Sequence, residues 1–149
     1  RLEALRVHKS VKPIGSPLPS TAIVPGCTSL HLAALYGLSA TVHLLLDGGA
    51  PPDFPRADGS TPLHLACCRG HTAVVEELLR AHARLDVANR AGAHPLSLAC
   101  AFDHLDVVKL LLRAGAKDGA ASGRDALELA RDRDCSAAVC AAIAASQAS

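Results

Sequence analysis

The chain has 149 residues, a length typical of one domain or of one array of repeats. Half of the residues are hydrophobic, but only 2% are aromatic and neither Trp nor Met occurs, so we expect stacked layers of Ala and Leu rather than a core of large side chains. The formal net charge of +1 gives no indication of nucleic acid or of an anionic membrane surface as a partner, and no apolar run reaches the roughly 18–20 residues of a membrane-spanning helix.

The placement of the six cysteines favours free thiols over a disulfide framework. Cys67 and Cys68 are adjacent, and both Cys67 and Cys100 fall in Ala-rich helical patterns, where Cys serves as a small buried apolar residue. We therefore expect a reducing compartment inside the cell, cytoplasm or nucleus. Because the chain begins at Arg1 without Met or a signal-like apolar segment, we also expect it to be a domain of a larger protein.

The first 25 residues differ in composition from the rest. Residues 1–9 are predicted to form a short helix around Leu2 and Leu5, and residues 11–25 contain four prolines and are predicted to be an extended linker. Four basic residues and one acidic residue make this segment basic. It is interpreted as a solvated tail or the remnant of an earlier repeat, with a basic docking arm as the alternative.

Two blocks of sequence then recur at a spacing of 33 residues. The first block reads GCTSLHLAA at 26–34, GSTPLHLAC at 59–67 and GAHPLSLAC at 92–100. The second block reads VHLLLDGGA at 42–50, VEELLRAHA at 75–83 and VKLLLRAGA at 108–116. Self-similarity at such a period indicates a solenoid of repeats.

Each repeat is predicted to be a pair of helices. In the second repeat Thr61 suits an N-cap, Pro62 suits the first helical position, and Gly70 ends the first helix in a left-handed conformation. The apolar face of the second helix comes from residues at helical spacing, namely Val74, Val75, Leu78 and Leu79.

A fourth, shorter unit follows from Gly123. It contains DALELARDRD at 125–134, with Asp125 and Glu128 spaced as a capping box, and a short helix SAAVCAAIAA at 136–145. It lacks the TPLH string. A polar, truncated last unit is expected because it must cover the stack without offering another apolar face.

The pattern G-x-T-P-L-H-x-A, then G-H, then V-V-x-x-L-L-x-x-G-A, resembles the ankyrin repeat, and the resemblance extends from residue 26 to about residue 145. It implies an all-α solenoid of stacked helix-turn-helix units, with β-hairpins or loops projecting at right angles. The expected divisions are a short helix and Pro-rich linker at 1–25, repeats at 26–58, 59–91 and 92–122, and a degenerate capping repeat with a tail at 123–149.

The resemblance also implies that the chain binds another protein on a concave surface lined by hairpin tips and first helices. In the family the positions that read the partner flank the repeat glycine and precede the glycine that ends the first helix. In this sequence they are Pro25, Cys27, Leu35, Tyr36, Asp58, Ser60, Cys68, Arg69, Ala91, Ala93, Ala101, Phe102 and, with less regular spacing, Arg124, Asp132 and Arg133.

Four of these positions form one predicted column: Tyr36, Arg69, Phe102 and Arg133 follow one another at intervals of 33, 33 and 31 residues. The column holds two of the three aromatic residues of the chain. Tyr and Arg are enriched among the residues that contribute most to binding energy, so we expect the column to be the centre of the binding surface. The alternative is that the aromatic rings pack against neighbouring loops while the arginines are merely solvated.

Other chemistry is disfavoured. In the family the histidine of TPLH is structural and bonds between adjacent hairpin loops, which assigns that role to His31 and His64, whereas the third repeat has Ser97 there. Potential zinc ligands recur at the repeat period, about 10 Å apart, which is too far for shared coordination; they are Cys67, Cys100, His71 and His104. We predict no metal and no cofactor.

No motif of a hydrolase or of a phosphate-binding loop is present, and we expect the chain not to be an enzyme. Two protein-binding functions remain open. The first is recruitment of a client, as in scaffold proteins or the substrate-receptor domains of ubiquitin-ligase adaptors. The second is inhibition by covering a kinase or a transcription factor. The features of a larger protein favour recruitment, with the isolated domain a monomer and with neither nucleic acid nor membrane as partner.

Overall fold

The computed structural model describes residues 26–116 and 136–147, apart from the side chains of residues 146 and 147, and all regular structure in these residues is helical. The helices are α2 (Ser29–Leu35), α3 (Ser39–Asp47), α4 (Pro62–Arg69), α5 (Thr72–Arg80), α6 (Pro95–Ala101), α7 (Leu105–Arg113) and α9 (Ala137–Gln147). The predicted N-terminal helix and linker, the capping box of the fourth unit and Arg133 lie outside the described residues.

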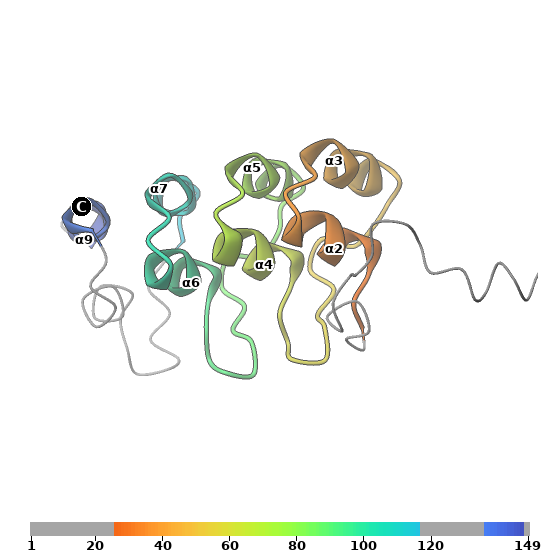
Figure 1. Cartoon of the computed structure of the whole chain (residues 1–149), viewed down its shortest axis with the longest axis horizontal. Helices are drawn as coiled ribbons and strands as arrows, with labels where there is room; N and C mark the ends of the chain where they lie inside the picture. The colour runs from red at the N-terminus through yellow and green to blue at the C-terminus, as the bar shows by residue number, and fades with distance from the viewer. Residues whose placement is uncertain (1–25, 117–135, 148–149) are drawn as a thin grey trace, which may run out of the picture.

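The helices form two layers (Figure 1). Helices α2, α4 and α6 pack side by side in one layer, and α3, α5 and α7 lie above them in the second. The loops between repeats project from the first layer, away from the second, and α9 packs against α7 at one end of the stack. The predicted all-α solenoid is confirmed.

The ends of the helices follow the predicted local rules. Thr61 is the N-cap of α4 with extended backbone, Pro62 is the first helical residue, and Gly70 ends the helix with φ of 74°. Thr28 caps α2 in the same way, and its side-chain oxygen accepts a hydrogen bond from the His31 backbone N–H. These caps satisfy backbone groups that a short helix would otherwise leave unpaired.

The core is made of the same positions in successive repeats. Leu30, Leu63 and Leu96 of the first helices are at most 2% exposed, and α9 adds Val139 and Ile143 at the end of the stack. No described core residue is aromatic, because Tyr36, Phe54 and Phe102 are all exposed. The predicted Ala- and Leu-rich layers are thus confirmed for the described part of the chain.

No disulfide joins the cysteines in the part of the chain that the structure describes. Cys67 and Cys100 are fully buried in the core, as their Ala-rich surroundings predict, and burial raises the pKa of the Cys67 thiol well above its ordinary value. These two residues therefore act as small apolar side chains and not as reactive thiols.

The projecting loops are closed by turns, with no strand assigned in the described ranges. In the first, the Gly59 backbone N–H donates to the Arg56 carbonyl over 2.9 Å, and in the second Gly92 donates to Asn89 over 2.9 Å. The Arg90 N–H also donates to the Asp58 carbonyl over 2.9 Å, so the two tips are joined directly. In 26–116 and 136–147, no helix combines the length and the apolar character that a membrane crossing demands.

Candidate protein-binding surface

Three of the four residues in the predicted column lie at equivalent places in the structure. Tyr36 and Phe102 are the C-cap residues of α2 and α6, with φ, ψ of −96°, 2° and −101°, 10°. Arg69 is the last residue of α4. Each is followed by a left-handed residue, and we call Tyr36, Arg69 and Phe102 the C-cap column.

The C-cap column is accessible. Tyr36 is 46% exposed and Phe102 is 47% exposed, and Arg69 is exposed between them in the repeat order. The third aromatic residue of the chain, Phe54, is exposed to a similar extent, at 44%. Each keeps a large apolar area that a partner can cover.

Two histidines tie the column from one repeat to the next. Nε2 of His71 lies 3.0 Å from the Leu35 carbonyl oxygen, and Nε2 of His104 lies 3.0 Å from that of Cys68. Since a carbonyl can only accept, each ring donates from Nε2 to the residue just before a column residue. The backbone under Tyr36 and Arg69 is therefore fixed by the following repeat.

Sequence reasoning considered these histidines only as metal ligands and missed this role. The sequence does place histidine at the same repeat position in two repeats, directly after the position of the glycine that ends the first helix in the second repeat. The equivalent residue pairs are Gly37–Leu38, Gly70–His71 and Asp103–His104. A Cβ at Gly37 would lie 2.6 Å from Nδ1 of His71, which shows how closely the ring approaches the preceding repeat. No set of three potential metal-binding side chains gathers anywhere in the described residues.

The other predicted partner-reading residues differ in accessibility. Leu35 and Cys68 are partly buried, Leu35 packs against the core, and burial raises the pKa of the Cys68 thiol. Asp58 is exposed at the first loop tip, whereas Ser60 is only 5% exposed. The Ser60 side chain therefore offers little surface to a partner, and the polar atoms of this residue form hydrogen bonds within and between the loops instead.

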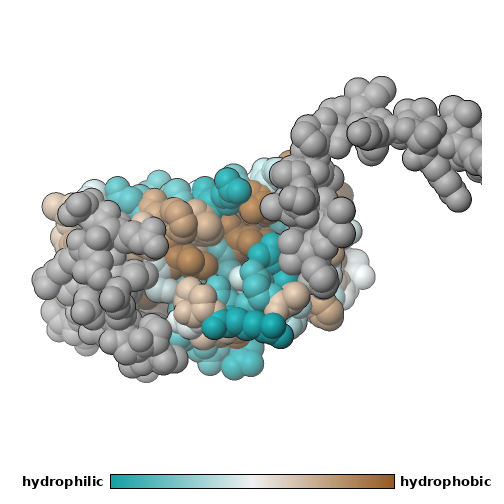
Figure 2. Space-filling model, turned by 60° about the horizontal axis from the view of Figure 1, so that its bottom comes forward, coloured by the Kyte–Doolittle hydropathy of each residue, from teal (hydrophilic) through white to brown (hydrophobic). Residues whose placement is uncertain are grey.

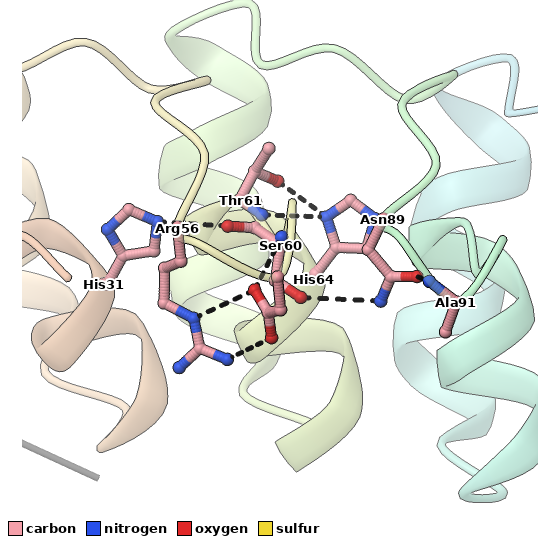
Figure 3. A network of polar contacts seen from close by, with 8 residues as sticks. His31, Arg56, Ser60, Thr61, His64, Asn89 and Ala91 are labelled. Atoms are coloured by element: carbon pink, nitrogen blue, oxygen red, sulfur yellow. Dashed lines mark hydrogen bonds and ion pairs between the residues drawn. The ribbon is translucent and has the colours of Figure 1, made fainter. Parts of the chain in front are cut away.

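An ion pair shapes the first loop tip (Figure 3). Nη2 of Arg56 lies 2.6 Å from Oδ2 of Asp58, and Oδ1 of Asp58 accepts a hydrogen bond from the Ser60 backbone N–H over 2.9 Å. The hydrogen bond from Arg56 is the main cause that lowers the pKa of Asp58 from 3.8 to about 2. Sequence reasoning singled out Asp58 but not Arg56, which neutralises its charge.

The histidines of the TPLH block are structural, as the family resemblance implies (Figure 3). Nε2 of His31 lies 3.2 Å from the Ser60 carbonyl oxygen, and Nε2 of His64 lies 3.0 Å from that of Ala93. Nδ1 of His64 accepts from the Thr61 backbone N–H over 3.0 Å. One neutral tautomer satisfies both contacts, and burial lowers the pKa of both rings.

The third repeat replaces this arrangement with a local one. The Ser97 hydroxyl accepts from the His94 backbone N–H over 2.9 Å and donates to the His94 carbonyl over 2.8 Å. The described contacts of Ser97 stay within its own helix end, because its side chain is too short to span two loops. Among the described residues, the third and fourth units are joined by the packing of α9 against α7 and by a hydrogen bond in which Oδ1 of Asp103 accepts from the Ser136 backbone N–H over 2.8 Å.

An apolar hollow of about 250 Å³ lies beside the first member of the C-cap column. It is lined by Tyr36, Ser29, Leu32, Ala33, Leu38 and Thr41. In the second repeat the residues equivalent to Leu32 and Thr41 are Leu65 and Val74, which are 9% and 0% exposed because the first repeat covers them. The hollow thus lies on the first face of the stack, which no other described repeat covers.

The comparisons agree with this architecture. Residues 30–122 match the family model for ankyrin repeats, in three copies. A comparison with curated proteins finds no match. Ankyrin repeats are modules that bind other proteins, and the match covers more than half of the chain. The chain therefore belongs to the ankyrin-repeat family.

Proposed function

We propose that this chain recruits a client protein, as a scaffold or substrate-receptor domain, and holds it on the C-cap column. The observation that carries the proposal is the recurrence of an exposed aromatic or arginine side chain at one backbone position in three repeats. Leu35 and Cys68 flank the column, Asp58 and Ser60 belong to the neighbouring loop tip, and Arg133 would extend the column into the fourth unit.

The character of the surface supports this proposal. Seen partly from the side of the projecting loops, the described part of the stack has hydrophobic residues near the middle, with hydrophilic residues above and below them (Figure 2). Protein interfaces combine an apolar centre with a polar rim in this way. The two histidine bonds also fix the backbone beside Tyr36 and Arg69, so less backbone conformational entropy is lost there when a partner binds.

We prefer recruitment to inhibition because no feature of the described surface requires that the partner's own functional site be covered. The free cysteines in the described residues fit the expected reducing compartment inside the cell, and we expect the domain to act as a monomer. Whether a captured partner keeps its own activity in the complex separates recruitment from inhibition.

The test is a proximity-labelling and pull-down experiment on the chain and on its Tyr36→Ala/Phe102→Ala variant. Loss of two column residues should cost about 2 kcal/mol each, so partners of the chain should be strongly depleted. Leu44→Ala is the matched control, because Leu44 is an apolar residue on α3 that is 69% exposed but lies in the other layer. Circular dichroism establishes that all three proteins are folded.

Partners that are lost from the double variant but kept by Leu44→Ala are the expected result. Partners that survive the double variant would contradict the proposal and move the binding surface elsewhere on the chain.

A further inference from the structure

The C-cap column has a fixed spacing, and that spacing suggests the shape of its ligand. Adjacent packed helices lie about 8–10 Å apart, and α2, α4 and α6 are adjacent in one layer. The bonds from His71 to Leu35 and from His104 to Cys68 hold the backbone beside Tyr36 and Arg69 to the next repeat. A ligand that contacts all three column residues must therefore present side chains at the same interval.

An extended peptide in the polyproline II conformation meets this requirement. It rises about 3.1 Å per residue with three residues per turn, so residues i, i+3 and i+6 lie on one face about 9 Å apart. A β-strand also spans about 10 Å in three residues, but its residues i and i+3 point to opposite faces. Of these two extended conformations, only polyproline II keeps both the interval and the direction.

The charge of the column specifies the middle residue of such a peptide. Arg69 is exposed, and within the described residues no carboxylate forms an ion pair with it. The exposed Asp58 carboxylate is already bound to Arg56. A carboxylate on the ligand is therefore the complementary group for Arg69, while the exposed rings of Tyr36 and Phe102 offer apolar area on either side.

The hollow beside Tyr36 strengthens the apolar requirement at that end. Its lining is mostly apolar and continues directly from the Tyr36 ring, so a branched aliphatic side chain can enter it. Because the column reads aromatic, arginine, aromatic, a ligand of the pattern apolar, acidic, apolar fits it in either chain direction.

We infer that the C-cap column binds an extended, polyproline II-type segment of a partner protein that carries an apolar residue, a carboxylate and an apolar residue at positions i, i+3 and i+6. This inference rests on the proposed function and names the chemistry of the client segment that the column recognises.

The probe is a fluorescein-labelled peptide Leu-Pro-Ala-Glu-Pro-Ala-Leu, blocked at both ends, titrated with the full chain and followed by fluorescence anisotropy. The prolines favour the polyproline II conformation before binding. The comparison peptides carry Lys in place of Glu, or one extra Ala in each spacer so that the interval becomes four residues.

We expect the parent peptide to bind about threefold more tightly than the Lys peptide, because an exposed ion pair contributes only modestly to affinity. The Arg69→Glu variant should reverse that preference. Phe102→Ala should weaken the parent peptide about tenfold, whereas Leu44→Ala should leave its affinity unchanged. Peptides with the longer interval should bind measurably more weakly than the parent.

Equal affinity for the two intervals, an unchanged preference in Arg69→Glu, or no binding of the parent peptide would each overturn the inference. The proposed function fails separately: it stands if whole partners are still lost from Tyr36→Ala/Phe102→Ala, and it falls if they are kept.

Discussion

The glycine that ends α4 allows two energetic costs to be separated by substitution. Gly70 has φ of 74°, and a Cβ placed on it would lie 2.5 Å from Nδ1 of His104. Gly49 has φ of 92°, but nothing lies within 4 Å of its Cβ position. Both Gly→Ala substitutions impose a left-handed conformation on an L residue, and Gly70→Ala alone also displaces the histidine of the next repeat.

The expected magnitudes follow from these two terms. Left-handed strain should lower the free energy of unfolding by about 1–2 kcal/mol in Gly49→Ala. In Gly70→Ala the ring of His104 must also move, and its 3.0 Å bond to the Cys68 carbonyl is lost, which adds about 1 kcal/mol. We therefore expect Gly70→Ala to cost about 2–3 kcal/mol in total.

A double-mutant cycle with His104→Ala isolates the second term. Once the ring is absent, the further cost of Gly70→Ala should fall to that of Gly49→Ala. Urea unfolding followed by far-ultraviolet circular dichroism gives the free energies, provided that the slope with urea is the same for all variants. A cost of Gly70→Ala that is the same with and without His104 would show that displacement of the His104 ring does not contribute to it.

Three further predictions concern stability. Leu63→Ala should lower the free energy of unfolding in urea by about 2–5 kcal/mol, because Leu63 is fully buried. Leu44→Ala, at an exposed position, should lower it by less than about 0.5 kcal/mol. Similar costs for the two substitutions would show that Leu63 is not in the core. Burial lowers the pKa of His31 and His64 from 6.5, so these rings bind protons more strongly in the unfolded chain than in the folded one. The free energy of unfolding should therefore be highest above about pH 6.5. Below that pH it should fall by up to about 1.4 kcal/mol per pH unit for each ring. A melting temperature that stays flat from pH 7 to pH 5 would contradict this. The pKa of Asp58 is lowered from 3.8 to about 2, so this residue contributes stability that is present above pH 3.8 and lost towards pH 2. Asp58→Asn should remove that part of the acid dependence in a pH titration of unfolding. An unchanged acid profile would show that the Arg56–Asp58 pair contributes nothing to stability.

The repeat period predicts where each helix begins and ends because the signals are local. Thr61 and Pro62 define the start of α4, and Gly70 its end, through the conformations that these residue types adopt most easily. The position of the C-cap column could be predicted for the same reason, since equal spacing in the sequence gives equal places in a stack of equal units.

Contacts between repeats could not be predicted in the same detail. The period places His71 near the preceding repeat, but it does not show that Nε2 reaches the Leu35 carbonyl, because that depends on ring orientation and on the space left by Gly37. The burial of Ser60 was missed for a similar reason: its neighbours come from two loops that are brought together only by folding.

Local chemistry at the loop tips also varies between repeats. The first tip uses the Arg56–Asp58 ion pair, whereas the second uses Asn89, whose Oδ1 accepts from the backbone N–H groups of Ala91 and Ala93, each over 3.0 Å. Both arrangements stabilise a turn of the same shape with different residues. The repeat pattern therefore predicts the shape of the loop tips but not the hydrogen bonds and ion pairs that stabilise each one.

The most direct test of the central claim, that the C-cap column is the surface on which a partner lies, is site-specific photocrosslinking. Phe102 is replaced in one protein, and Leu44 in another, by photoreactive benzoylphenylalanine, and each protein is irradiated in cell extract. We expect a discrete crosslinked partner from position 102 and none from position 44, where an apolar residue that is even more exposed lies in the other layer. A partner captured from position 44 but not from position 102 would contradict it.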